Sequence, residues 1–168
     1  SMVSMILTGL YETLLMTAAS SFFSYVIGIP LGVLLVVSDT NGIKPMPVLN
    51  GVLGSVINLI RSVPFMILLI MVIPLTRLIV GTSIGPVAVI PPLVIAAAPY
   101  IARMVESSLK EVDAGVIEAA KSMGASNMQI IFKVLLPESK PSLLVGAAIS
   151  VTTILGYSAM AGFTGGGG

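Results

Sequence analysis

The sequence of 168 residues contains no cysteine and no histidine. Their absence excludes disulfides, thiol chemistry, zinc sites built on these side chains and histidine-based acid–base catalysis. Charged residues are also scarce, at 9%, whereas a soluble domain typically has about 25%. The net charge of +1 is too small to indicate a nucleic-acid partner. We therefore predict no metal site, no catalytic residues, no cofactor and no nucleic-acid partner.

Hydrophobic residues make up 56% of the sequence, which is too much apolar surface for a soluble fold of this size. A membrane span needs about 20 predominantly apolar residues. Four apolar stretches are candidate spans, at 13–38, 48–75, 87–102 and 142–160, and Arg61 interrupts the second. The first stretch is longer than the apolar core of a signal peptide and follows no basic region. We therefore predict an all-α polytopic membrane protein, with about four spans in one transmembrane domain over residues 1–168.

The longest polar segment runs from 103 to 140 and holds five of the eight basic residues. Lys44 lies in another loop an even number of spans away, and only Arg77 falls on the opposite side. By the positive-inside rule, the long loop is cytoplasmic, and the N-terminus and the four-glycine end are outside. Five acidic residues make the loop neutral, which suits a protein contact better than anionic lipid or nucleic acid.

Arg61 stands out because a charged side chain at membrane depth costs roughly 2.5–3.5 kcal/mol on insertion scales. One interpretation is that Arg61 lines a polar cavity or an interface between subunits. The other is that it snorkels, or lies where the helix breaks at Ser62-Val63-Pro64. Prolines recur through the spans and could act as hinges, but proline is also common in membrane helices.

Capping signals divide the polar loop into two short helices. Asp113 can cap a helix that begins at residue 114, and Gly124 comes where a left-handed residue is expected after it. Ser126 and Gln129 fit a capping box that starts the second helix, and Pro137 is expected to stop it. Each helix carries an apolar stripe at helical spacing, formed by Val116, Ile117, Ala120 and Met123 and by Met128, Ile131, Phe132 and Leu135.

Three functions are compatible with such a pair of helices. A DNA-binding helix-turn-helix is disfavoured because the segment is neutral and tethered between spans. A hairpin lying on the membrane surface is the second alternative. The third, which we favour, is a rigid element docked in a groove of a cytosolic protein, since helix-in-groove docking uses an apolar stripe. The small residues Ala119, Ala120 and Gly124 would allow close approach.

The loop also resembles a known motif. Glu118-Ala119-Ala120, followed by Gly124, Val134 and Leu136-Pro137 at fixed spacing, is similar to the EAA loop of permease subunits of ABC importers. The family has isoleucine in place of Val134. The resemblance implies that Glu118, Ala119, Ala120, Gly124, Leu136 and Pro137 belong to a cytoplasmic coupling loop, about 103–141, that seats in a cleft of an ATP-binding subunit.

The rest of the chain resembles the permeases of methionine-uptake ABC importers. The segments that carry this resemblance are 61–65, 81–85, 99–106 and 156–162. It implies a type I ABC importer permease fold in a bacterial cytoplasmic (inner) membrane. The family has a fifth span after the glycine-rich segment, so we expect the C-terminal span to be missing from these residues.

The implied partners are two copies of an ATP-binding subunit, a second copy of the permease, an extracytoplasmic methionine-binding lipoprotein and membrane lipid. ATP hydrolysis would belong to the partner chain, since no phosphate-binding loop motif occurs here. The implied cargo is methionine, in its L form and also its D form. Another amino acid or an osmolyte is an alternative cargo, and a non-transporting scaffold is a different class of function.

Met160 is a candidate for the gate of the pore. It ends the fourth apolar stretch and is followed by Ala161-Gly162, small residues that allow close packing of helices. Two copies of this flexible thioether, meeting on a dimer axis, could close the pore. Ordinary packing is the alternative role.

Overall fold

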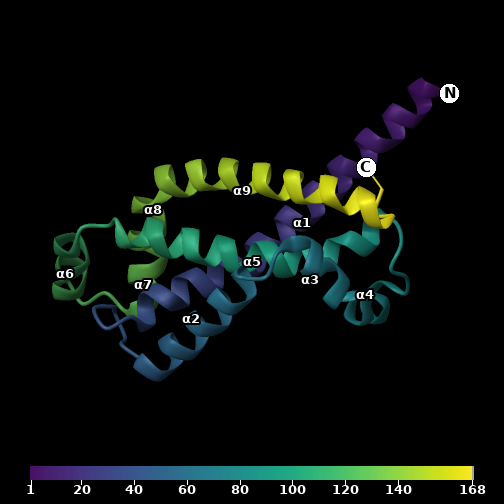
Figure 1. Ribbon diagram of the computed structural model, residues 1–168. Coiled ribbons are helices and arrows are strands. Elements are labelled where there is room, and N and C mark those ends of the chain that lie inside the picture. Colours follow the sequence, from purple (N-terminus) through teal and green to yellow (C-terminus); the bar gives the residue numbers. More distant parts are fainter. Residues whose placement is uncertain (168) are drawn as a thin grey trace.

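Three long helices dominate the computed structural model, which describes residues 1–167 apart from the side chains of Phe163 and Thr164. They are α1 (Met2–Ser38), α5 (Pro86–Lys110) and α9 (Lys140–Met160), and Figure 1 shows them running along one another. The four-glycine end extends to Gly168, which lies outside the described residues. Residues 1–167 contain no strand, which confirms the all-α prediction.

Shorter elements lie between and after these helices. In chain order they are α2 (Pro47–Arg61), α3 (Phe65–Met71), α4 (Ile73–Val80), α6 (Ala114–Ser122), α7 (Asn127–Ile130), the π-helix η1 (Ile131–Leu135), α8 (Leu136–Glu138) and the 3₁₀-helix η2 (Ala161–Thr164). In Figure 1, α6, α7 and α8 lie at one end of the long helices, and the N-terminus and the end of α9 lie toward the other.

The first span is longer than the sequence indicates. Its helix begins at Met2 rather than at residue 13, because Ser1 forms a capping box with Ser4 and nothing breaks the helix at Glu12. Its 37 residues extend for about 55 Å at 1.5 Å per residue, whereas a bilayer core is about 30 Å thick. The N-terminal part of α1 therefore projects past the other helices (Figure 1).

The second apolar stretch is not one straight span, which corrects the prediction for 48–75. It forms α2 and α3, whose axes are bent by 102° at the break. Pro64 has no N–H to continue the helix and disfavours helical geometry in Val63, so α2 ends at Arg61. Residues 1–167 therefore contain three helices long and apolar enough to cross a membrane, or four spans if the bent pair counts as one.

The remaining boundaries also shift. Helix α5 runs two turns beyond Ala102, to Lys110, so the first residues of the predicted polar loop continue a spanning helix. Arg77 lies within α4 rather than in the break, which begins at Gly81. Charged residues led us to predict loops after Ala102 and around Arg77. A helix can nevertheless contain charged residues where their side chains reach water.

Helices α1 and α5 pack closely because two glycines on α1 remove side-chain bulk. A Cβ added to Gly28 would lie 2.6 Å from Ile101 Cγ2, and one added to Gly32 would lie 2.6 Å from Val105 Cβ. Both contacts are shorter than van der Waals separation, so neither position has room for a side chain. Small residues of this kind let membrane helices approach one another closely.

Two loops predicted to share one side of the membrane do meet. The turn after α1 contacts the end of α5, where Lys110 Nζ lies 2.8 Å from Asp39 Oδ2. At the opposite end, the Gly85 N–H donates to the Gly165 carbonyl at 2.9 Å. The turn after α1 and the polar loop thus lie together, away from the segment that precedes α5.

Candidate functional site

The polar loop begins with the helix that the sequence predicts. Asp113 caps α6, and its Oδ1 accepts the backbone N–H of Gly115 at 2.9 Å. Helix α6 then runs over nine residues and none of them is buried. The capping bond satisfies one of the free N–H groups at the start of the helix, so α6 is locally stabilised although most of its surface is exposed.

The turn between α6 and α7 has the predicted geometry. Gly124 has a φ of +82°, in the left-handed region that favours glycine. Two residues later Ser126 Oγ accepts the Gln129 N–H at 3.2 Å, and Gln129 Oε1 accepts the Ser126 N–H at 2.8 Å. The capping box and the glycine turn are both confirmed, and together they fix the angle between the two helices.

Pro137 does not stop the second helix, which corrects that prediction. The helix passes from α7 through the π-helical turn of η1 and continues to Glu138, one residue beyond the proline. In the wider turn the Leu136 N–H donates to the Ile131 carbonyl, five residues back. A single-residue break at Ser139 then separates this helix from α9.

The two apolar stripes are each only half covered. From the first, Ile117 and Ala120 pack on the hydrophobic core, and from the second Ile131 and Leu135 are buried in it. The other four side chains stay exposed, with exposed fractions of 40% for Val116, 88% for Met123, 61% for Met128 and 60% for Phe132. We call these four exposed apolar residues, which lie between the start of α6 and η1, the loop surface.

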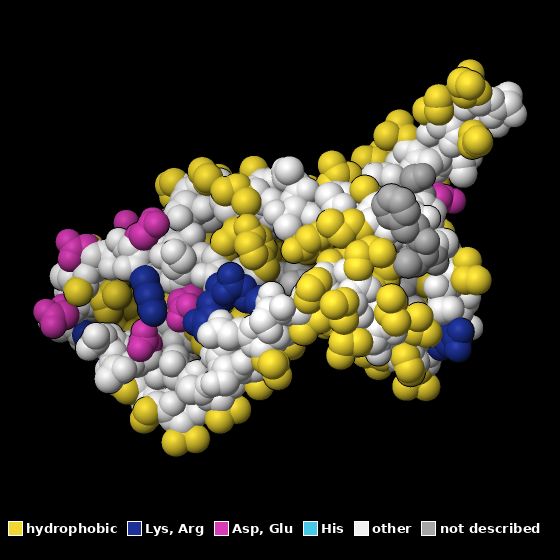
Figure 2. Space-filling view, viewed as in Figure 1, with side chains coloured by type: hydrophobic (Ala, Val, Ile, Leu, Met, Phe, Trp, Pro, Cys, Tyr) yellow, Lys and Arg dark blue, Asp and Glu magenta, His cyan; other side chains and the backbone are white. Residues whose placement is uncertain are grey.

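The motif residues lie beside the loop surface. Glu118, Ala119, Gly124 and Pro137 are exposed, whereas Ala120 and Leu136 are partly buried. No ion pair involves Glu118 within the described part of the chain. Figure 2 shows charged side chains gathered at this end of the molecule, while much of the remaining face is hydrophobic.

A chain of charged side chains ties the loop end to three helices, and sequence reasoning missed it. Lys110 bridges Asp39 at 2.8 Å and Glu106 at 3.4 Å, and Glu106 also pairs with Arg103 at 2.9 Å. Arg103 in turn donates to Asn58 Oδ1 at 3.1 Å on α2. The hydrogen bond from Lys110 holds the pKa of the Asp39 carboxyl below its usual range. Only the helical spacing of the three α5 residues could have indicated part of this chain.

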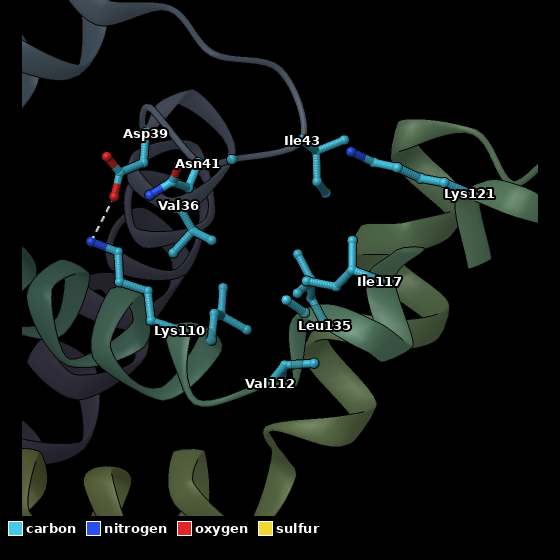
Figure 3. A pocket seen from close by; sticks show the side chains of 12 residues that line it. Val36, Asp39, Asn41, Ile43, Lys110, Val112, Ile117, Lys121 and Leu135 are labelled. Carbon is cyan, nitrogen blue, oxygen red and sulfur yellow. Dashed lines mark ion pairs between the residues drawn. The ribbon is translucent and has the colours of Figure 1, made fainter. Parts of the chain in front are cut away.

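A cavity of about 380 Å³ separates α6 from the ends of the long helices. Figure 3 shows Ile117, Leu135 and Val112 pointing into it from the loop, opposite Val36. Its polar edge is formed by Asp39, Asn41, Lys110 and Lys121. The loop is therefore joined to the bundle by η1 and the end of α5, without close packing of α6 on α1.

A second, smaller cavity lies among the spanning helices, about 200 Å³ in volume. It is lined by Ile60, Arg61, Val63, Phe65, Ala96, Tyr100 and Tyr157. The rings of Phe65 and Tyr157 stack with centroids 4.9 Å apart and planes 4° from parallel. Arg61 therefore fits both predicted descriptions, since it ends α2 at the break and also lines a cavity.

Met160 lies at the end of α9 that is remote from the polar loop, and 40% of it is exposed. It follows Tyr157 by three residues, so the two side chains are neighbours on the helix surface. The structure thus places the six motif residues at one end of the molecule and Met160 toward the other. Arg61 belongs with the second group, since it shares a cavity with Tyr157.

Residues 28–168 match the model of the family described as binding-protein-dependent transport system inner membrane component. The chain is 51% identical over 162 residues to the D-methionine transport system permease protein MetI of Salmonella typhimurium, covering 96% of this chain and 75% of that protein. It is 51% identical over 161 residues to the protein of the same description from Escherichia coli, covering 96% and 74%.

Solved structures give the same correspondence in three dimensions. A crystal structure of the MetNI methionine ABC transporter in inward-facing conformations matches with a TM-score of 0.98 and 51% identity, covering 99% of this chain and 77% of that chain. An amino acid ABC transporter with histidines matches with a TM-score of 0.69 at 22% identity, covering 98% of this chain and 75% of that chain. The latter match supports the fold alone.

Proposed function

Because this chain belongs to the family of inner membrane components of binding-protein-dependent transport systems, we propose that it is the permease subunit of an ATP-driven importer of methionine. One observation carries the proposal: 51% identity to a D-methionine permease extends over 96% of the chain. The identity thus includes the spans as well as the loop. A permease for another amino acid or an osmolyte is the second candidate, since the cargo could be selected by a separate binding protein.

ATP hydrolysis belongs to a separate ATP-binding subunit in this proposal. The sequence of 168 residues has no phosphate-binding loop motif. Two permeases would pair with two ATP-binding subunits, and an extracytoplasmic methionine-binding lipoprotein would deliver the cargo. The chain would lie in the bacterial inner membrane with the polar loop in the cytoplasm, and five of its eight basic residues lie between 103 and 140.

The loop surface is the proposed contact with the ATP-binding subunit. Four large apolar side chains are exposed on it, beside Glu118, Ala119 and Gly124. Exposed apolar side chains grouped in a polar loop are typical of an interaction site. Closure of two ATP-binding subunits would draw two such loops together. Helices continuous with the loop would pass this displacement to the spans and change the accessible side of the pore.

Reconstitution tests the proposal directly. The permease and its ATP-binding subunit, placed in proteoliposomes with a methionine-loaded binding protein, are expected to accumulate methionine only when ATP is present. An ATP-binding subunit that binds but does not hydrolyse ATP is the control. If ATP hydrolysis responds to another amino acid but not to methionine, the cargo is that amino acid. Hydrolysis without uptake of any solute would indicate a non-transporting scaffold.

Met160 is the proposed gate, and a cysteine at this position is expected to cross-link the two permeases. The 168 residues contain no other cysteine, so the introduced thiol has no competitor among them. We expect the Met160→Cys pair to cross-link without nucleotide and to cross-link less when ATP holds the pore open. Leu78→Cys on α4, 82% exposed, is the control. A Met160→Cys permease that forms no cross-link in any nucleotide state would eliminate the gate.

A further inference from the structure

Arg61 shares a cavity with residues of the spanning segments α3, α5 and α9. Helix α2 starts at Pro47, just after the turn that bears Asp39 and Lys44, and runs 15 residues to Arg61. At 1.5 Å per residue the helix rises about 22 Å, and the hydrocarbon core is about 30 Å thick. Ionisable residues within spanning segments usually face a polar pathway or the interior of an assembly and mark a functional site.

The charge of Arg61 has no protein counter-ion in the described part of the chain. All three ion pairs among residues 1–167 involve Arg103 or Lys110, at the polar-loop end. The Arg61 side chain is exposed and borders the cavity of about 200 Å³. An unpaired guanidinium beside a small cavity presents a fork of donors that fits a carboxylate.

Three of the other lining side chains are aromatic, beside the aliphatic Ile60, Val63 and Ala96. The stacked rings of Phe65 and Tyr157 come from α3 and α9, and Tyr100 comes from α5. Drug-sized ligands occupy pockets of roughly 300–1,000 Å³, so about 200 Å³ suits a smaller molecule, such as a single amino acid. A thioether side chain makes favourable contacts with aromatic rings. The cavity thus combines a guanidinium suited to an anion with aromatic side chains suited to a thioether.

We propose that this cavity, the Arg61 cavity, is a transit site for apolar α-amino acids on their way through the permease. The Arg61 guanidinium binds the α-carboxylate in a bidentate manner, and the Phe65–Tyr157 pair contacts the side chain. The proposal rests on the proposed function and adds the part of the cargo that the permease recognises. The site lies one helical turn from Met160 along α9, on the side toward the polar loop.

The lining contains no acidic side chain, so the α-ammonium group has no charged partner in the cavity. The hydroxyl groups of Tyr100 and Tyr157 can accept hydrogen bonds from the α-ammonium group. They can equally donate to the hydroxyl oxygen of an analogue that has a hydroxyl where the amino acid has its ammonium group. Recognition therefore depends on the carboxylate and not on the ammonium. Methionine and its 2-hydroxy analogue, which keeps the carboxylate, are expected to bind, whereas methioninamide is not.

The first test compares uptake by variants of the complete permease assembled with its ATP-binding subunit. Arg61→Gln is expected to lower ATP-driven methionine uptake at least tenfold while the complex still copurifies, and Arg61→Lys is expected to restore part of the loss. Arg77→Gln is the matched control, because Arg77 lies on α4 and does not line the cavity. Uptake by Arg61→Gln within twofold of the unmodified permease would overturn the proposal.

The second test detects occupancy without the binding protein. A thiol reagent is applied to Ala96→Cys, which places one cysteine in the cavity lining. L-methionine and its 2-hydroxy analogue are expected to slow the reaction at least fivefold, methioninamide is expected not to, and the protection is expected to disappear in Ala96→Cys with Arg61→Gln. Protection by methioninamide, protection that survives Arg61→Gln, or none at all would overturn the site. Uptake by the unmodified permease separately tests the proposed function.

Discussion

Replacing Gly124 by valine is expected to abolish ATP-driven uptake. The residue has a φ of +82°, and a β-branched side chain is a strong outlier in that region. Relieving the strain would rotate α7 against α6 and remove Met128 and Phe132 from the loop surface. Uptake and ATP hydrolysis by proteoliposomes measure the effect, and we expect hydrolysis to continue without uptake or the ATP-binding subunit to be lost on purification.

Two controls separate the causes of the Gly124→Val effect. Gly124→Asn adds a side chain that tolerates the left-handed region, so it should retain uptake if only the backbone matters and lose it if the partner approaches closely. Gly81→Val places the same strain at the end of α4, where φ is +92° and an added Cβ also meets open space. It should leave coupling intact. Normal uptake and assembly by Gly124→Val would remove the loop turn from the coupling mechanism.

Replacing Gly32 by leucine is expected to prevent a stable permease from forming. An added Cβ would lie 2.7 Å from the Ala102 carbonyl oxygen and 2.6 Å from Val105 Cβ. Since one of these neighbours is backbone, α1 and α5 must separate. Overpacking costs typically about 1–3 kcal/mol, and here it disrupts the contact between two long spanning helices. The yield of assembled complex and its thermal unfolding temperature measure the loss.

Gly51→Leu is the matched control for Gly32→Leu. Gly51 lies on α2, and an added Cβ has nothing within 4 Å in this chain. Leucine is also the better helix former of the two residues, so this variant should assemble in normal yield. Equal yields from the two variants would show that close packing of α1 on α5 is not required.

Local signals in the sequence predicted the helix caps and the glycine turn of the loop correctly. Asp113, Gly124 and the Ser126–Gln129 capping box each act within a few residues, so their effect does not depend on the rest of the fold. Pro137 was predicted wrongly to end its helix because the π-helical turn before it has no clear sequence signature. The start of α1 was misplaced for a related reason. Hydropathy falls at Glu12, but the helical hydrogen bonds continue through this residue.

The features within the membrane depend on tertiary contacts and could be predicted only in part. The sequence indicated a break near Pro64, but it did not predict the 102° angle between α2 and α3. It marked Arg61 as unusual without identifying the neighbours from α5 and α9. The link between Asp39 and Lys110 likewise joins residues far apart in the chain. No pattern within either segment specifies such pairings.

The near-continuity of α8 and α9 has a mechanical consequence. Only Ser139 separates them, and α9 is a rod of 21 residues, about 31 Å long at 1.5 Å per residue. The polar loop is attached to one end of this rod and Met160 to the other. A push by the ATP-binding subunit on the loop would therefore be passed along α9 toward Met160, with Ser139 as the joint between the loop and this rod.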